Sequence, residues 1–557
     1  MDLYRAFLAI VLSFLILLGY QYFFPHSLQQ TPAEPQQSQQ QSQQQSQQQS
    51  QPGQQATPGP AAPAVAGALP PVTVDPTARE ITVDTPLFTA VINEQGGGFK
   101  SFVLKHYRQG MDRSSGPMQL VPGRNITEAP VLFSLDNGAG TSVPTFRADR
   151  EKLTLAAGQK TGQLVMTATQ ADGVRITRTL TFHADSYLID AAYAVANPTD
   201  RPLQVSPALT LGNEPFVAAK ESSTFLFFGP AAYVNGELVE TKGKELTKGP
   251  VVLQGKVDWT GYMDSYFMTA VVPVGGEART VTLQGGEEQV RTVISEGIQQ
   301  LPAQGTQTYG YRMYLGPKKL QILQASGDNL ARAVDFGWFD VIAKPMLWML
   351  NFFHTYVGNY GVAIILLTIL IKLAFWPITQ KGMLSMKNMQ KLQPKIAKLR
   401  EKYKADPAQM NQEMMALYKT YKVNPLGGCL PMLIQIPFFF ALYRVLMAAI
   451  ELRHAPFMLW INDLSAPDRL WLGFNLPYLQ GLPVLTLLMG ASMYLQQKMT
   501  PTTVDPAQAR IMQFLPVVFT FMFINFASGL VLYWFVNNLL SILQQYLINR
   551  QTKTQQA

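Results

Sequence analysis

The stretch "ILLTILIKLAFWPIT", residues 365–379, reads as the middle of a membrane-spanning helix, yet Lys372 lies inside it. A lysine at the centre of the hydrocarbon layer costs about 2.5–3.5 kcal/mol on insertion scales. Ionisable residues at such positions usually face protein or water and carry function. The chain is therefore predicted to have a membrane-embedded part, and Lys372 is its first candidate site residue.

Further apolar segments follow Lys372. Residues 511–549 carry no charge over 39 residues. At about 1.5 Å per residue this run is roughly twice the thickness of the hydrocarbon core. It is predicted to form two spans that turn near "NFASG", residues 525–529. The five expected core spans are residues 358–377, 428–450, 481–498, 511–528 and 529–549.

The N-terminal part contains one more apolar segment. Residues 6–24 are uncharged, and no small-x-small cleavage site follows promptly, which favours an uncleaved signal anchor (residues 1–26) over a cleaved signal peptide. Residues 27–70 are rich in Gln and Ser, then in Pro, Ala and Gly, and have almost no apolar side chains to bury. This composition predicts a disordered linker.

Residues 71–320 are predicted to be all-β. The stretch "GVRITRTLTFHADSYLIDAAYAVANPTDRPLQVS", residues 173–206, alternates apolar and polar residues and is punctuated by turn residues. Short strands over this length favour one large sandwich. Residues 321–357 turn helical and are rich in Trp and Phe with few charges, which suits helices lying in the membrane interface.

The distribution of Lys and Arg predicts the orientation. Residues 378–427 contain ten Lys or Arg and three acidic residues, which places this segment in the cytoplasm by the positive-inside rule. Alternation then places the β domain and the loop 451–480 outside, in the periplasm of a two-membrane bacterium. The loop 499–510, the tail 550–557 and the N-terminus lie inside.

The basic segment 378–427 is predicted to be a helical hairpin. Its apolar residues, many of them Met, recur every three or four positions, and Asp406 followed by Pro407 marks the start of the second helix. The apolar stripe packs within the hairpin or forms a docking surface, and self-packing is favoured. Four basic residues are candidates for docking ribosomes or anionic lipid: Lys395, Lys398, Arg400 and Lys402.

Four motifs carry a family resemblance: "VNPLGGCLPMLIQIPFFFALY", "DLSAPD", "QKMTPTTV" and "SGLVLYWFVNNLLSILQQ". With the order of the parts, they resemble the YidC/Oxa family of membrane protein insertases, in the Gram-negative form with a large periplasmic domain. The resemblance implies an N-terminal anchor helix, a galactose-mutarotase-like periplasmic sandwich, a five-helix core and a cytoplasmic hairpin.

The resemblance also implies a function. Such proteins are inner-membrane chaperones that insert newly made proteins, alone or with SecYEG, SecDF, the ribosome and the signal-recognition machinery. They are not enzymes and use no nucleotide or metal cofactor. Their core forms a hydrophilic groove carrying a positive charge, usually an Arg, which is Lys372 here. The other groove positions implied are Thr368, Gln435, Asn525, Tyr533, Trp534 and Asn537.

Two other functions remain open. A transporter or channel with an anion-binding cavity is the main alternative, although the core spans lack the carboxylates that proton or cation transport needs. A membrane-anchored sugar enzyme would use His106 and His183, but neither lies in a recognisable acid/base motif. For Lys372 itself, snorkelling to the cytoplasmic surface competes with a groove-facing position.

Overall fold

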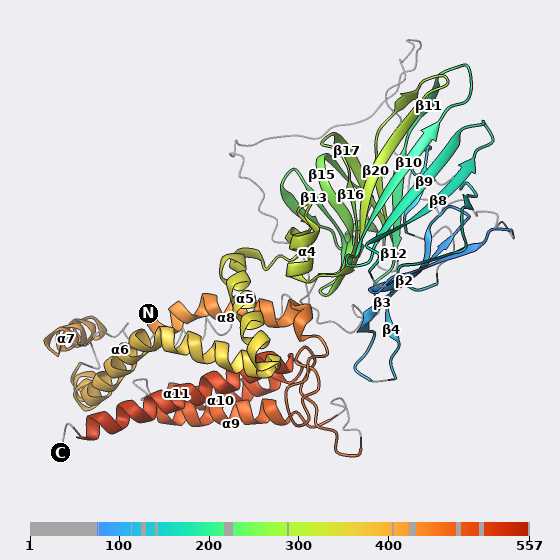
Figure 1. The fold of residues 1–557 in the computed structure, drawn as a ribbon. Helices are drawn as coiled ribbons and strands as arrows, with labels where there is room; N and C mark the ends of the chain where they lie inside the picture. The colour runs from blue at the N-terminus through green and yellow to red at the C-terminus, as the bar shows by residue number, and fades with distance from the viewer. Residues whose placement is uncertain are drawn as a thin grey trace, which may run out of the picture. The chain divides into compact units, whose positions relative to one another are not determined.

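The computed structural model describes residues 75–554, apart from 76, 113, 124–129, 140–142, 157, 217–226, 287–288, 404–405, 422, 424–429, 475–480 and 501–505. The expected anchor and the linker lie outside the described residues. The described chain consists of a β domain followed by helices (Figure 1).

The smaller sheet of the β domain has five strands in the order β4-β3-β2-β1-β7. Its neighbours pair antiparallel, except that β1 and β7 run parallel. The strands are β1 (Glu80–Asp84), β2 (Phe88–Asn93), β3 (Phe99–Arg108), β4 (Pro117–Val121) and β7 (Lys152–Thr154).

The larger sheet has 13 strands, most of them in the order β5-β12-β18-β17-β15-β16-β20-β10-β9-β8-β6 (Figure 1). Off this path, β13 pairs with β15, and β14 pairs with β13. Its strands are β5 (Leu132–Ser134), β6 (Arg147–Ala148), β8 (Thr161–Thr169), β9 (Arg175–His183), β10 (Leu188–Ala196), β12 (Ala208–Asn213), β13 (Gly229–Val234), β14 (Glu237–Glu240), β15 (Val251–Met263), β16 (Phe267–Pro273), β17 (Ala278–Gly285), β18 (Val290–Ser295) and β20 (Thr306–Pro317). Two short strands, β11 (Leu203–Val205) and β19 (Gln299–Leu301), form a separate pair.

The five-stranded sheet and the 13-stranded sheet share one apolar core. Phe88 of β2 and Phe182 of β9 are buried in the same cluster, with their ring centroids 6.4 Å apart. Buried residues alternate with more exposed ones along β8, β9 and β10, as the sequence pattern predicts for strands covered on one face. The prediction of a β-sandwich for this region is confirmed, with one short helix, Gly243–Leu246, as the exception among the described residues.

The helices are α3 (Gly243–Leu246), α4 (Leu320–Ser326), α5 (Asp340–Val357), α6 (Tyr360–Lys402), α7 (Pro407–Thr420), α8 (Leu430–Ala448), α9 (Val484–Met499), α10 (Pro506–Phe523) and α11 (Ser528–Thr554). Short 3₁₀ turns occupy Leu330–Ala333, Gly337–Phe339 and Ile450–Leu452. Every expected core span thus falls on a helix, and the predicted turn lies between Phe523 and Ser528. Among the described helices, α6 is the one that is both long enough and apolar enough to cross a membrane, while Ile434–Ala448 and Gln513–Phe523 are shorter apolar segments.

The junction between α5 and α6 follows from two residues. Gly358 adopts a left-handed conformation (φ 64°) that ends α5, and the Asn359 side chain accepts a hydrogen bond from the Val362 N–H to start α6. Along α5, Trp348, Phe352 and Tyr356 form an exposed aromatic row, with centroids 5.6 and 5.0 Å apart. This row fits the interfacial position expected for residues 321–357.

Helix α6 does not end where the expected span does. It runs unbroken for 43 residues from the apolar segment into the basic hairpin, with Pro377 and Pro394 inside it. The second hairpin helix, α7, begins as predicted, because Asp406 accepts hydrogen bonds from the N–H groups of Ala408 and Gln409. Met389, Leu392 and Ile396 on the first hairpin helix are buried, so part of the apolar stripe of that helix is shielded from solvent.

Candidate functional site

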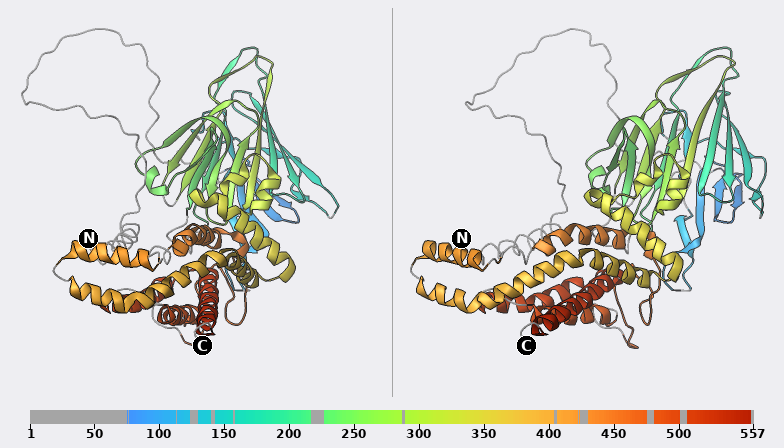
Figure 2. Two further views of the ribbon diagram at one scale, coloured as in Figure 1. Left: turned by 90° about the vertical axis from the view of Figure 1, so that its left-hand side faces the viewer. Right: turned by 60° about the vertical axis from the view of Figure 1, so that its left-hand side comes forward.

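Lys372 is buried between helices. Its side chain is only 7% exposed, and its ammonium Nζ donates a hydrogen bond of 2.6 Å to Oγ of Ser541 on α11. The Ser541 hydroxyl in turn donates to the backbone carbonyl of Asn537, at 2.7 Å. Helices α6 and α11 lie side by side (Figure 2), so this chain of hydrogen bonds joins the first and last helices of the core.

The polar chain continues towards α8. Nε2 of Gln435 on α8 approaches Oδ1 of Asn537 at 3.5 Å, the long limit of a hydrogen bond. Thr368 is buried one turn before Lys372, but its hydroxyl donates to the Ile364 carbonyl of its own helix at 2.6 Å. The structure therefore brings Lys372, Asn537 and Gln435 together on three helices, and places Thr368 beside them on the same helical face.

Aromatic side chains lie one turn before Asn537 on α11. Tyr533 is 3% exposed and stacks near Phe439 of α8, with centroids 6.4 Å apart. Trp534 contacts Phe439 and Phe523 edge-on, at 4.9 and 5.0 Å. These rings pack α8, α10 and α11 together, so the polar groups have an apolar boundary on this side.

Asn525 does not belong to this group. It is exposed in the turn between α10 and α11, where its Oδ1 accepts a hydrogen bond of 2.8 Å from Arg469. The expectation that Asn525 lines the groove rested on its alignment with a family position. In the structure, Asn525 stabilises the turn by pairing with the loop that precedes α9.

Sequence reasoning missed further polar contacts of α11. Gln544 is fully buried and bonds to Thr379 of α6, with Nε2 to Oγ1 at 2.9 Å, and Asn549 accepts from Lys387 at 3.2 Å. On another face, Asn538 donates to Ser492 of α9 at 3.0 Å. The signal was present in "VNNLLSILQQ", residues 536–545, where polar residues recur at helical spacing within an apolar run.

The two halves of the chain match two family models. One, described as 60Kd inner membrane protein, matches residues 352–556, and the other, described as YidC periplasmic domain, matches residues 80–349. A relative in Syntrophobacter fumaroxidans, named membrane protein insertase YidC, is 42% identical over 564 residues, covering 98% of this chain and 99% of its own. The chain belongs to the YidC family of membrane protein insertases.

Other YidC relatives agree. The membrane protein insertase YidC of Geobacter sulfurreducens is 44% identical over 488 residues, covering 85% of this chain and 87% of its own. Among solved structures, an active YidC insertase with its first transmembrane domain resolved is 19% identical with a TM-score of 0.36, covering 86% of this chain and 95% of that one. A galactose mutarotase related enzyme from Lactobacillus acidophilus is 9% identical with a TM-score of 0.32, covering 42% of this chain and 97% of that one.

Membership of the YidC family decides the general function. The chain is an inner-membrane protein that inserts nascent membrane proteins, and it is not an enzyme. The transporter and sugar-enzyme alternatives are therefore set aside. In the β domain, His106 lies on β3 of one sheet and His183 on β9 of the other, where it pairs with Asp190 at 2.8 Å.

The basic residues expected to dock partners of this YidC-family chain lie on the hairpin surface. Lys395, Lys398, Arg400 and Lys402 are all exposed. Lys395 also lies 4.3 Å from the ring centroid of Tyr421, just beyond α7, and its ammonium contacts the Tyr421 hydroxyl. This contact links the two helices of the hairpin and leaves Lys398, Arg400 and Lys402 facing solvent.

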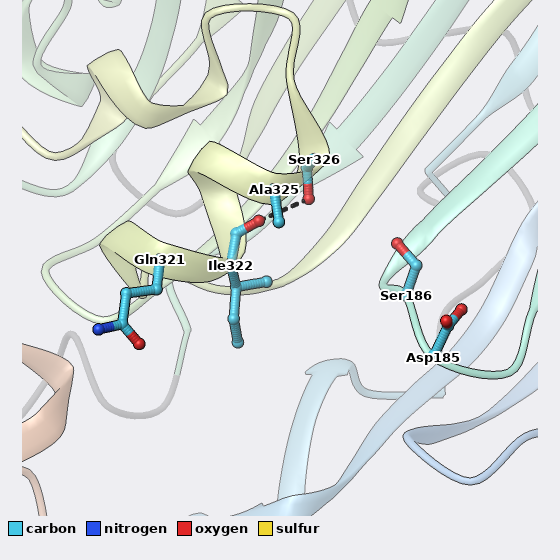
Figure 3. Close-up of a pocket in the computed structure, with 6 residues that line it drawn as sticks. All are labelled: Asp185, Ser186, Gln321, Ile322, Ala325 and Ser326. Carbon is cyan, nitrogen blue, oxygen red and sulfur yellow. Dashed lines mark hydrogen bonds between the residues drawn. The ribbon is translucent and has the colours of Figure 1, made fainter. Parts of the chain in front are cut away.

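A pocket of about 380 Å³ lies on the periplasmic β domain of this YidC-family chain (Figure 3). It is lined on one side by Asp185 and Ser186 of the turn between β9 and β10, and on the other by Gln321, Ile322, Ala325 and Ser326 of α4. The Ser326 hydroxyl donates to the Ile322 carbonyl at 2.9 Å, and the Ser186 hydroxyl accepts from the Leu188 N–H at 3.1 Å. None of the residues predicted for the functional site lines this pocket.

Proposed function

We propose that this insertase captures the translocating segment of a client electrostatically, in a polar groove formed by α6, α8 and α11 around Lys372. The ammonium attracts acidic residues of the client and draws the segment partway into the membrane. Water in the groove shortens the hydrocarbon that the segment must cross. The apolar part of the client then moves sideways into lipid, and no covalent step is needed.

The burial of Lys372 next to a neutral partner carries this proposal. An ammonium has three N–H donors. Within the described residues, the ammonium of Lys372 donates to the Ser541 hydroxyl. A buried positive charge without a carboxylate beside it attracts an anion strongly, because charges interact over longer range when water is partly excluded. A client carboxylate supplies the missing negative charge only while it passes through the groove.

The direction of the side chain argues against snorkelling. Lys372 lies five residues before Pro377, about 7.5 Å along the helix, so its stem is long enough to reach towards the cytoplasmic surface. The ammonium instead bonds to Ser541 on the neighbouring helix and is almost inaccessible. A side chain held sideways in this way supports a role inside the core.

The orientation and partners of the insertase are part of the proposal. The ten Lys or Arg of residues 378–427 support a cytoplasmic hairpin, cytoplasmic termini and a periplasmic β domain. With the N-terminal anchor, the chain crosses the membrane six times. The basic hairpin recruits ribosomes and the signal-recognition machinery, and the insertase works alone or beside SecYEG and SecDF.

Replacing Lys372 by Leu tests the mechanism. The test uses full-length protein in liposomes and two clients that differ only in whether the translocating segment carries acidic residues. Lys372→Leu should insert the acidic client about tenfold less efficiently, as expected for loss of an interaction with a desolvated charge, and should insert the neutral client normally. Lys372→Arg should retain insertion of both.

A matched control comes from the same helix. Lys387→Leu removes another lysine of α6 that bonds to α11, closer to the hairpin, and should leave the acidic client unaffected. Normal insertion of the acidic client by Lys372→Leu would overturn the capture mechanism. It would leave snorkelling as the explanation of this lysine.

A further inference from the structure

Ser541 occupies a special place in the groove. Its hydroxyl proton is engaged by the Asn537 carbonyl at 2.7 Å, so its oxygen lone pairs remain to accept the hydrogen bond from Lys372. The serine is 3% exposed and sits on α11, 169 residues away from the lysine in sequence. The backbone of α11 therefore determines that Ser541 is the acceptor, and Lys372 the donor, in the hydrogen bond between them.

We propose that Ser541 is a positioning residue, which holds the ammonium of Lys372 in the groove and leaves two of its N–H donors for a carboxylate of the client. This inference rests on the capture mechanism proposed above. A lysine side chain has four rotatable bonds, and an unrestrained ammonium would spend most of its time at the nearest water. A neutral acceptor restrains the charge without cancelling it.

The choice of serine is informative. An aspartate at position 541 would bind Lys372 more strongly, but it would neutralise the charge that attracts the client. An alanine would remove the hydroxyl that accepts the hydrogen bond from Lys372. A hydroxyl provides the one acceptor that orients the donor and remains weaker than a carboxylate, so an incoming acidic residue competes successfully.

A second contact keeps Ser541 in register with Lys372. Two turns further along α6, Thr379 exchanges hydrogen bonds with the fully buried Gln544 of α11, at 2.9 and 3.2 Å. Gln544 lies three residues after Ser541 and so on the same side of α11. This contact resists sliding of α11 along α6, which would separate Ser541 from the ammonium.

A bond of the same type elsewhere separates positioning from simple helix packing. Ser492 of α9 accepts a hydrogen bond from Asn538 of α11 at 3.0 Å, and both residues are nearly fully buried. This pair joins two core helices without involving any lysine. Ser492→Ala is therefore a matched control for Ser541→Ala.

The experiment compares Ser541→Ala, Ser541→Thr and Ser541→Asp with Ser492→Ala, in full-length protein and with the same acidic and neutral clients. Ser541→Ala should lower insertion of the acidic client about fivefold, less than the full worth of a hydrogen bond to a charged group because water replaces part of it. Ser541→Thr restores the hydroxyl and should recover at least half of the wild-type rate. Insertion of the neutral client should change by less than twofold in each variant.

The aspartate variant adds a sharper outcome. Ser541→Asp should reduce insertion of the acidic client to the level of Lys372→Leu, and combining the two substitutions should cause no further loss. If Ser541→Ala lowers insertion of the acidic and the neutral client equally, the positioning role is wrong and Ser541 only packs the helices. The same conclusion follows if Ser492→Ala lowers insertion of the acidic client as much as Ser541→Ala does. If Ser541→Asp does not accumulate in the membrane, the Ala and Thr pair decides by itself.

The two proposals fail in different ways. If Lys372→Leu inserts the acidic client normally, the capture mechanism fails, whatever the Ser541 variants do. If Lys372→Leu is impaired while Ser541→Ala and Ser541→Asp are normal, capture stands and positioning by Ser541 is wrong.

Discussion

Two buried charges, Glu94 in the β domain and Lys372 in the helical core, have opposite surroundings. Glu94 is fully buried and receives hydrogen bonds from Arg79 at 2.7 Å, from Arg147 at 3.1 Å and from the Ala148 N–H at 2.9 Å. The ammonium of Lys372 donates to a neutral group, the Ser541 hydroxyl. Glu94 is compensated within the β domain, whereas among the described residues Lys372 bonds to a hydroxyl and to no carboxylate. Under the proposed mechanism, the client supplies that carboxylate.

A second pair in the β domain follows the same rule as Glu94. Arg279 and Glu296 lie 2.9 Å apart with side chains only 6% and 5% exposed, and the Tyr311 hydroxyl also donates to Glu296 at 2.7 Å. In such a pair each buried charge is compensated by the other, so neither charge is available to bind a partner. The rule has an exception in the β domain, since Arg178 is also fully buried and, among the described residues, bonds to the Gly97 carbonyl and not to a carboxylate. An uncompensated buried charge therefore marks a candidate site and does not by itself prove function.

The largest effect is expected when the uncompensated charge is reversed. Lys372→Glu should abolish support of growth in cells depleted of their own insertase and lower insertion of acidic clients by more than about tenfold, because like charges brought together cost several kcal/mol. The control is Lys372→Arg, expected to support growth. Growth on the Glu variant would show that the sign of the charge is irrelevant.

Removing a compensated charge should affect stability instead of insertion. Glu94→Gln should lower the free energy of unfolding of the full-length protein by about 2 kcal/mol, since the carboxylate bonds to two arginines and a buried N–H are weakened. Thermal unfolding in detergent measures this. Insertion by the folded variant should remain normal, and a large insertion defect without destabilisation would contradict the comparison.

The stability change from Glu94 should depend on pH. Burial raises the pKa of Glu94, but the hydrogen bonds from Arg79 and the Ala148 N–H outweigh it and lower the pKa from 4.5 to about 2. Its contribution is therefore complete above about pH 4.5 and is lost as the pH falls through about 2. Glu94→Gln should show no such dependence at this site, so the two proteins should converge in acid.

Exposed charges form an intermediate case. Reversing Lys395, Lys398, Arg400 and Lys402 to Glu should weaken co-sedimentation with ribosomes about tenfold at low salt, and wild-type binding should fall steeply with salt while the variant changes little. Reversal of Lys344, which pairs with Asp340 on α5 at 2.6 Å, compared with reversal of Lys398 alone, controls for the position of an equal charge change. Unchanged binding at every salt concentration would reduce the hairpin charges to a topology signal.

The smallest effect is expected from removing the β domain. Deleting residues 71–310 while keeping 321–358 should change insertion by less than about twofold, because the polar chain around Lys372 is built from α6, α8 and α11. A deletion that extends through α5 removes the exposed aromatic row and should impair the core. Loss of insertion in the shorter deletion at normal protein levels would show that the β domain takes part directly.

Periodicity and capping residues predicted the β region, the helical segments and the start of α7 at Asp406, but not the individual strands or the continuation of α6 into the hairpin. They also singled out Lys372, since a charge in an apolar run is visible without any structure. The partner of that charge was not predictable, because Ser541 meets Lys372 only through the rotation and crossing of two helices far apart in sequence. Asn525 shows the converse: the family resemblance placed it in the groove, but the turn after α10 directs it to Arg469.

The unbroken course of α6 has a mechanical consequence. A helix of 43 residues is about 65 Å long. Lys372 lies in its first third, and the exposed basic residues of the hairpin lie towards its C-terminal end. If the hairpin docks a partner as proposed, a tilt of the hairpin would be transmitted along this helix to the segment that holds Lys372, as far as the helix stays straight. Pro377 and Pro394 each lack a backbone N–H and are the natural points of bending. Stiffening them by Pro→Ala would couple cytoplasmic docking more tightly to motion in the groove.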